Sequence, residues 1–78
     1  MKRSKSLTRQ LGSVIRDLRV KSGMSQVIFG EKCGFYQTYI SRIEGGSPNP
    51  TINAIEIIAK ALNLSIFELM EMVRQSQE

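Results

Sequence analysis

Apolar residues recur three or four positions apart along most of the chain, which is the spacing of one face of an α-helix. The first such stripe predicts a helix over about residues 8–21, which ends before the turn-forming pair Ser22 and Gly23. The apolar positions of this stripe are Leu7, Leu11, Val14, Ile15 and Leu18.

Two shorter helices are expected next, with a glycine between them. Ser25 can cap a helix over residues 26–33, because its side-chain oxygen can accept a hydrogen bond from a backbone N–H of the first turn. Gly34 then supplies the positive φ that a tight turn needs. A third helix is expected over about residues 37–44, and the pair of glycines that follows should end it.

The second half of the chain predicts two more helices after a loop. The segment 47–50 reads SPNP, and its two prolines disfavour helical conformation at the residues before them. Thr51 can cap the fourth helix, and Asn63 can end it in the left-handed conformation. Ser65 and Glu68 form a capping box that opens the fifth helix. No segment alternates apolar and polar residues for long enough to predict a strand, so we expect an all-α domain.

The third predicted helix has two chemically different faces. Tyr36, Ile40 and Ile43 fall on one side and are expected to dock the helix on the core. Glu44 lies at the margin beside Ile40, so the opposite side carries no carboxylate. Glutamine can bond adenine, arginine can bond guanine and the threonine methyl can contact thymine in the major groove. An ordinary solvated face is the alternative, although such faces usually mix Lys with Glu. The opposite side consists of Gln37, Thr38, Ser41 and Arg42.

Charge is divided unevenly along the chain, whose net charge is +4. Residues 1–42 hold nine basic and two acidic residues, a net charge of +7. Residues 43–78 hold two basic and five acidic residues, a net charge of −3. The first part therefore suits a polyanionic partner, although basic residues that only keep two helices soluble would give the same numbers.

Several classes of function are disfavoured by composition. The chain has no histidine and one cysteine, Cys33, which excludes an intramolecular disulfide and a four-ligand cysteine/histidine zinc site. Cys33 has no evident base beside it, which disfavours a nucleophilic role for its thiol. No apolar run approaches the roughly 20 residues that cross a membrane. We therefore expect no enzyme, catalytic residue, metal, cofactor, small-molecule ligand or membrane contact.

Over roughly residues 8–72 the sequence closely resembles the lambda-repressor/Cro-like, or Xre, family of helix-turn-helix DNA-binding proteins. The resemblance implies a compact five-helix lambda-repressor-like domain whose helix-turn-helix motif covers about residues 26–45. The combination that carries it is Gly23-x-Ser25-Gln26, Gly34, Tyr39-Ile40-Ser41-x-Ile43-Glu44-x-Gly46 and Asn49-Pro50-Thr51.

The resemblance also implies a function and residue roles. A member of this family would be a sequence-specific regulator of transcription, acting as a homodimer on a pseudo-palindromic operator in double-stranded DNA with residues 37–44 in the major groove. Arg19 and Glu44 would form a structural ion pair. The positions that match the family's base readers are Gln37, Thr38, Ser41 and Arg42. Those that match its contacts to the DNA backbone are Gln26, Tyr39, Gly46, Ser47 and Asn49.

The resemblance implies self-association through the region of the last helix, because small members of the family that stand alone use it. Part of the apolar stripe of that helix, together with the fourth helix, is expected to form the dimer contact, and the alternative is that the whole stripe faces the core. The residues of the stripe are Ile66, Leu69, Met70 and Val73.

Two alternatives remain for the same fold, a protein-interaction module anchored by Val27 and Ile28 or an antitoxin-type subunit. The layout resembles restriction-modification controller proteins, phage Cro-like repressors and helix-turn-helix antitoxins about equally. The sequence leaves open whether such a regulator represses or activates.

The chain is expected to divide into three parts. Residues 1–7 would form a flexible basic arm, residues 8–74 the domain and residues 75–78 a short tail. A bacterial or phage-encoded protein of this kind would be cytoplasmic, and associated with the nucleoid when bound to DNA.

Overall fold

The computed structural model describes residues 6–47 and 49–76, and within these ranges it consists of helices and connecting turns. The prediction of an all-α, five-helix fold is confirmed, and the first helix begins one residue earlier than expected. The helices are α1 (Leu7–Lys21), α2 (Gln26–Cys33), α3 (Gln37–Glu44), α4 (Ile52–Ala61) and α5 (Ile66–Gln75).

Side chains at the helix starts account for most of these boundaries. Ser25 Oγ accepts a hydrogen bond of 3.1 Å from a backbone N–H of α2, and Thr51 Oγ1 accepts one of 3.0 Å from α4. At α5 the capping box is complete, since Glu68 N donates to Ser65 Oγ at 3.0 Å and Ser65 N donates to Glu68 Oε1 at 2.8 Å. These contacts are local, which is why the sequence predicted them.

The helix ends that were expected to turn sharply do so. Gly34 ends α2 with φ of 81°, and the N–H of Phe35 donates back to a carbonyl in α2 at 2.8 Å. Asn63 follows α4 with φ of 62°. Each left-handed residue reverses the chain within a few positions and so sets the next helix against the previous one.

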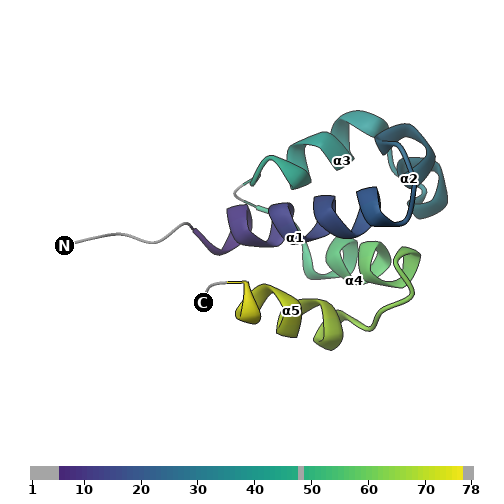
Figure 1. Ribbon diagram of the computed structural model, residues 1–78. Coiled ribbons are helices and arrows are strands. Elements are labelled where there is room, and N and C mark those ends of the chain that lie inside the picture. The colour runs from purple at the N-terminus through teal and green to yellow at the C-terminus, as the bar shows by residue number, and fades with distance from the viewer. Residues whose placement is uncertain (1–5, 48, 77–78) are drawn as a thin grey trace.

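Helix α1 lies across the middle of the molecule, with α2 and α3 on one side and α4 and α5 on the other (Figure 1). It packs against both α3 and α5, while α2 contacts α3 and α4. One continuous core results, and the inner face of α3 is part of it through Ile40 and Ile43. The buried core residues are Leu11, Ile15, Phe29, Ile40, Ile43, Ile55, Ile58, Ala59, Ala61, Leu69 and Val73.

Helices α1 and α3 come close together at Gly12. A Cβ atom at this position would lie 2.4 Å from the carbonyl oxygen of Ile43 and 2.6 Å from that of Glu44. Backbone atoms cannot move aside as a flexible side chain can, so only glycine fits. The carboxyl end of α3 therefore rests directly on the backbone of α1.

The expectation that Tyr36 docks α3 on the core is wrong. Its side chain is 86% exposed, because Tyr36 precedes the helix with φ of −71° and ψ of 152°. A residue in this extended conformation does not continue the angular spacing of the helix that follows. The aromatic contact beside α3 is made by Phe35 and Tyr39, whose ring centroids are 4.8 Å apart in an edge-on arrangement.

The structure describes only some of the residues of the predicted arm and tail. Leu7, assigned to the arm, is the first residue of α1, whereas the rest of the predicted arm at residues 1–5 lies outside the described residues. The predicted tail begins at Gln75, which is still helical, and residues 77–78 also lie outside the described residues. None of the described helices is long and apolar enough to cross a membrane.

Candidate nucleic-acid interface

The outward face of α3 is a surface of uncharged polar groups with one arginine. The side chains of Thr38, Ser41 and Arg42 are exposed and make no hydrogen bond or ion pair with the part of the chain that the structure describes. Gln37 at the start of the helix is exposed as well. These four positions, expected to read bases, therefore lie together on one accessible side, opposite Ile40 and Ile43.

The acidic residue of α3 is turned away from this surface and neutralised. Arg19 of α1 donates to Glu44 through Nε at 2.6 Å to Oε2 and through Nη2 at 3.0 Å to Oε1. The side chains are only 10% and 3% exposed, respectively. Arg19 Nη1 also donates to the carbonyl of Met24 at 2.8 Å. The hydrogen bond to Glu44 raises the pKa of Arg19 above its ordinary value, so the guanidinium stays charged. The structure thus brings together the two residues that the sequence paired.

Two glutamines extend this buried pair to the surface. Gln26, the first residue of α2, donates from Nε2 to Glu44 Oε1 at 3.0 Å. Gln37, the first residue of α3, donates from Nε2 to Gln26 Oε1 at 2.6 Å. Sequence reasoning placed these residues at the interface but missed the contacts between them, because the partners lie 18 and 11 positions apart. The amino ends of α2 and α3 therefore meet at one polar cluster.

The other residues expected to hold the DNA backbone lie within α3 and in the loop that follows it. Tyr39 is half-buried against Phe35, Gly46 and Ser47 are half-buried in the loop, and Asn49 is exposed. The loop is tied to α1 by a hydrogen bond of 3.4 Å from Thr8 Oγ1 to the carbonyl of Gly46. The neighbouring loop residue 48 lies outside the described residues.

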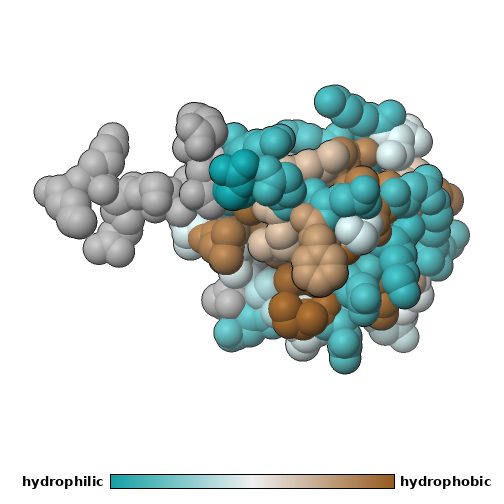
Figure 2. Space-filling view, turned by 90° about the horizontal axis from the view of Figure 1, so that it is seen from below, coloured by the Kyte–Doolittle hydropathy of each residue, from teal (hydrophilic) through white to brown (hydrophobic). Residues whose placement is uncertain are grey.

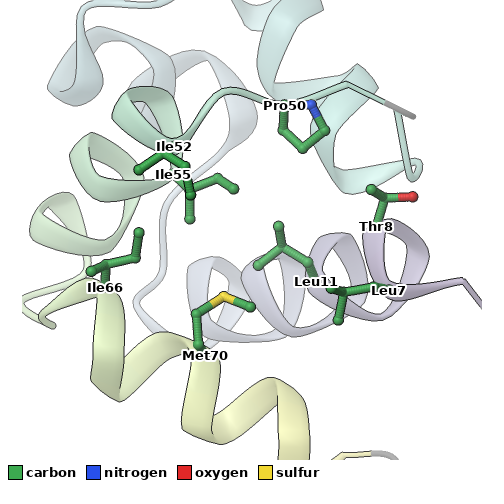
Figure 3. Close-up of a pocket in the computed structure, with 8 residues that line it drawn as sticks. All are labelled: Leu7, Thr8, Leu11, Pro50, Ile52, Ile55, Ile66 and Met70. Atoms are coloured by element: carbon green, nitrogen blue, oxygen red, sulfur yellow. The ribbon is translucent and has the colours of Figure 1, made fainter.

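The residues expected to form a dimer contact separate into two groups. Leu69 and Val73 are buried in the core of the single chain, at 0% and 1% exposure, so their side chains have no surface to offer a partner. Ile66 and Met70 are half-buried and line a groove of about 290 Å³ bounded by α1, α4, α5 and Pro50 (Figure 3). The expected contact is therefore corrected to exclude Leu69 and Val73.

Two large apolar residues at the starts of α4 and α5 are mostly exposed, and sequence reasoning singled out only the first of them as part of an apolar stripe. Ile52, which lines the groove at the start of α4, is 70% exposed, and Phe67 near the start of α5 is 82% exposed. Seen from below the view of Figure 1, apolar side chains gather into one patch on this side of the molecule (Figure 2). The sequence could have indicated the exposure of Phe67, because this large apolar residue lies outside the apolar stripe of its helix.

Val27 and Ile28 form a smaller exposed apolar pair on α2, at 52% and 51% exposure. Cys33, at the other end of the same helix, is half-buried, and burial raises the pKa of its thiol. A raised pKa keeps the thiol protonated and therefore a weak nucleophile, as expected for a residue that packs beside the core.

Comparison with known proteins finds a helix-turn-helix domain family and relatives that are control proteins. The model of a helix-turn-helix domain family matches residues 10–71. The control protein C.BamHI of Bacillus amyloliquefaciens is 39% identical over 61 residues, which are 77% of this chain and 75% of that protein. The control protein C.SmaI of Serratia marcescens is 35% identical over 60 residues, 77% of this chain and 71% of that protein.

Solved structures extend the similarity to the arrangement of the helices. The wild-type restriction-modification controller protein C.Esp1396I superposes with a TM-score of 0.81 at 35% identity, covering 92% of this chain and 94% of that one. The clp gene regulator ClgR of Corynebacterium glutamicum superposes with a TM-score of 0.88 at 20% identity, covering 96% and 80%. The second likeness concerns the fold alone.

Proposed function

The chain belongs to a helix-turn-helix domain family of DNA-binding transcriptional regulators, and we propose that it acts as a homodimeric controller of the restriction-modification type. It is not an enzyme. The proposed target is a pseudo-palindromic operator in double-stranded DNA, with α3 of each protomer in the major groove. Such a regulator would work in the cytoplasm, associated with the nucleoid when bound to DNA.

The observation that carries the proposal is the acid-free outer face of α3. A carboxylate there would meet the negative potential of the DNA, but Glu44 is 3% exposed and paired with Arg19. The groups that remain outside are those that pair with base edges, namely an amide at position 37, hydroxyls at positions 38 and 41, and the guanidinium of Arg42.

Phosphate contacts would set the position of α3 in the groove. Gln26 begins α2, where unpaired backbone N–H groups and the helix dipole favour an anion. Its Nε2 uses one hydrogen for Glu44 and keeps a second that can reach a phosphate. Tyr39, Ser47 and Asn49 would add contacts on the other side of α3. These contacts carry no sequence information directly, so their loss should weaken binding to all sequences alike.

The apolar face at α4 and α5 supports the homodimer. Ile52, Ile66 and Met70 line the groove, and Phe67, which follows Ile66 on α5, is 82% exposed. Exposed large apolar residues concentrated on one face mark interaction surfaces. A second copy that covers this face would place two α3 helices for two half-sites about 10 base pairs apart, or a multiple of that.

Selection of bound sequences from a random pool of double-stranded DNA, followed by footprinting, tests the proposal. A two-fold symmetric site should emerge, and affinity should fall steeply as salt rises from about 50 to about 200 mM, because bound phosphates release counterions. Sedimentation equilibrium of the free protein should show a dimer. Binding that does not depend on salt, or a selected pool without any common sequence, would contradict the function; a monomer on a single half-site would contradict only the dimer.

A further inference from the structure

We propose that Arg9, near the amino end of α1, binds a DNA phosphate beside the carboxyl end of α3. The inference rests on the proposed function, because it adds a contact at the edge of the same interface. It assigns a DNA-binding role to a helix that lies outside the helix-turn-helix motif.

The residues proposed to hold the DNA backbone lack positive charge. None of the five is basic, and the chain carries no charged residue between Glu44 and Glu56. Proteins gain much of their affinity for DNA from cations that neutralise phosphates and release the bound counterions. A cation from another element would supply what the loop after α3 lacks.

Arg9 packs directly against this loop. A Cβ atom on Gly46 would lie 2.6 Å from Arg9 Cγ and 3.2 Å from Arg9 Cα, so the stem of the arginine fills the space that a loop side chain would need. Thr8, the preceding residue, donates from Oγ1 to the carbonyl of Gly46 at 3.4 Å. The first turn of α1 is thus joined to the loop at two adjacent residues, next to the carboxyl end of α3 (Figure 1).

The guanidinium of Arg9 remains available to a partner. Arg9 is exposed, and its side chain makes no hydrogen bond or ion pair within the part of the chain that the structure describes. Arg19, on the same helix, is instead held by Glu44. Arginine stays charged, and its planar guanidinium can bond two phosphate oxygens at once. Because the stem of Arg9 rests on Gly46, it loses less conformational freedom on binding than an arginine that projects freely into water.

The position of Arg9 indicates which phosphate it reaches. The loop is bonded back to α3, since the N–H of Ser47 donates to the carbonyl of Arg42 at 2.9 Å. Arg9 therefore lies near the end of α3 that carries Arg42, whereas Gln26 lies near the other end, where its amide meets Gln37. We expect Arg9 to bind a phosphate that flanks the base pair read by Arg42. Arg9 and Gln26 would then hold α3 in the groove at both of its ends.

Paired substitutions at Arg9 separate its charge from its packing. Arg9→Met removes the charge but keeps an unbranched stem against Gly46, whereas Arg9→Lys keeps both. Arg16→Met is the control, because it removes a charge from an exposed position seven residues further along α1. Affinity for the selected operator is measured over a range of salt, and again with operators in which one phosphate at a time is replaced by a neutral methylphosphonate. Thermal melting checks that each variant is folded.

The expected effect is a loss of affinity that does not depend on sequence. Arg9→Met should weaken binding by roughly two- to fivefold for each lost contact, as for an ion pair between exposed groups, and should leave the base preference unchanged. The slope of log affinity against log salt should become shallower by about 0.9 for each protomer, because one fewer phosphate is neutralised. Arg9→Lys should keep most of the slope. One methylphosphonate position in each half-site should weaken binding by the unaltered protein but not by Arg9→Met.

Two results would overturn the inference. If Arg9→Met keeps the full slope, or loses no more of it than Arg16→Met, Arg9 contributes only general charge attraction. If every methylphosphonate position affects Arg9→Met as much as the unaltered protein, Arg9 binds no particular phosphate. Both results leave the proposed function standing, since the bases would still be read from α3. An unaltered protein that selects no common sequence would refute the proposed function, together with this inference.

Discussion

The α3 side and the α5 side of the molecule each contain an arginine–glutamate pair, but they place it in opposite surroundings. Arg19 and Glu44 are 10% and 3% exposed, and the pair holds α3 to α1. Arg74 and Glu71, one turn apart on α5, are 65% and 50% exposed, and their charged atoms are 2.5 Å apart, against 2.6 Å in the buried pair. The distance between the charged atoms therefore does not show which pair contributes to the stability of the fold. The exposure of the side chains to water does.

The difference also decides what each side shows to a partner. On the α3 side the acid is buried, so the outer surface is left with amides, hydroxyls and one arginine. On the α5 side the charges stay in water, and Phe67 and the groove lined by Ile66 and Met70 offer apolar contact. One side thus suits a polar, negatively charged partner and the other suits a second protein surface.

Removing the buried acid should have the largest effect. Glu44→Ala leaves Arg19 charged, 8% exposed and without its carboxylate partner, so the free energy of unfolding should fall by about 3–5 kcal/mol in chemical denaturation. Gln26 would also lose an acceptor. A Glu44→Ala protein that keeps its Tm but loses affinity for DNA would show that Glu44 belongs to the reading surface instead.

Arg42 should show the next largest effect, on DNA recognition alone. Arg42→Ala should cost about 1–3 kcal/mol of discrimination at one base pair of the operator, measured by competition between operators that differ at that pair. Arg16→Ala is a matched control, since it removes the same charge from an exposed position on α1. Equal losses of discrimination in both variants would reduce the role of Arg42 to general charge attraction.

Truncation of the apolar face should weaken self-association. Phe67→Ala removes a ring that is 82% exposed in the single chain, and the dimer should lose about 1–2 kcal/mol of association free energy, as truncated interface anchors do. Sedimentation equilibrium measures the change. Val20→Ala, at a residue 57% exposed near the end of α1, is the control and should leave the dimer intact. If both variants associate as strongly as the unaltered protein, the interface lies elsewhere.

The exposed pair on α5 should have the smallest effect. Hydrogen bonds from Arg74 lower the pKa of Glu71, so any stabilisation by the charged carboxylate is present above its ordinary pKa and is lost as pH falls through the lowered value. Because both side chains are in water, Glu71→Ala should leave Tm at neutral pH unchanged within error. A clear drop in Tm would mean that the two pairs differ less than their exposure indicates.

The helices could be predicted because their determinants are local. Ser25, Thr51 and Ser65 cap the helices that follow them, and Gly34 turns the chain where positive φ is needed. Each of these contacts spans a few residues, so the sequence displays both partners together. The error at Tyr36 has a local cause as well, since helical spacing was applied one residue before the helix begins.

The contacts that each surface side chain makes were harder to predict, because they depend on how the helices pack against one another. The apolar stripe of α5 identifies Leu69 and Val73 as buried, but spacing alone does not distinguish burial in the chain's own core from burial against a second chain. The bonds that join Gln26 to Glu44 and Gln37 arise only when α2 lies beside α3. Their residue types were visible in the sequence, whereas their contacts were not.

The contact at Gly12 has a practical consequence for anyone who redesigns the operator preference. Because α3 sits on α1 through backbone atoms, its docking does not depend on the outward side chains, and a library that varies Thr38, Ser41 and Arg42 should consist largely of folded proteins. Position 12 must remain glycine in every member. Position 37 is best varied together with position 26, because a new residue at either one changes what the other can bond.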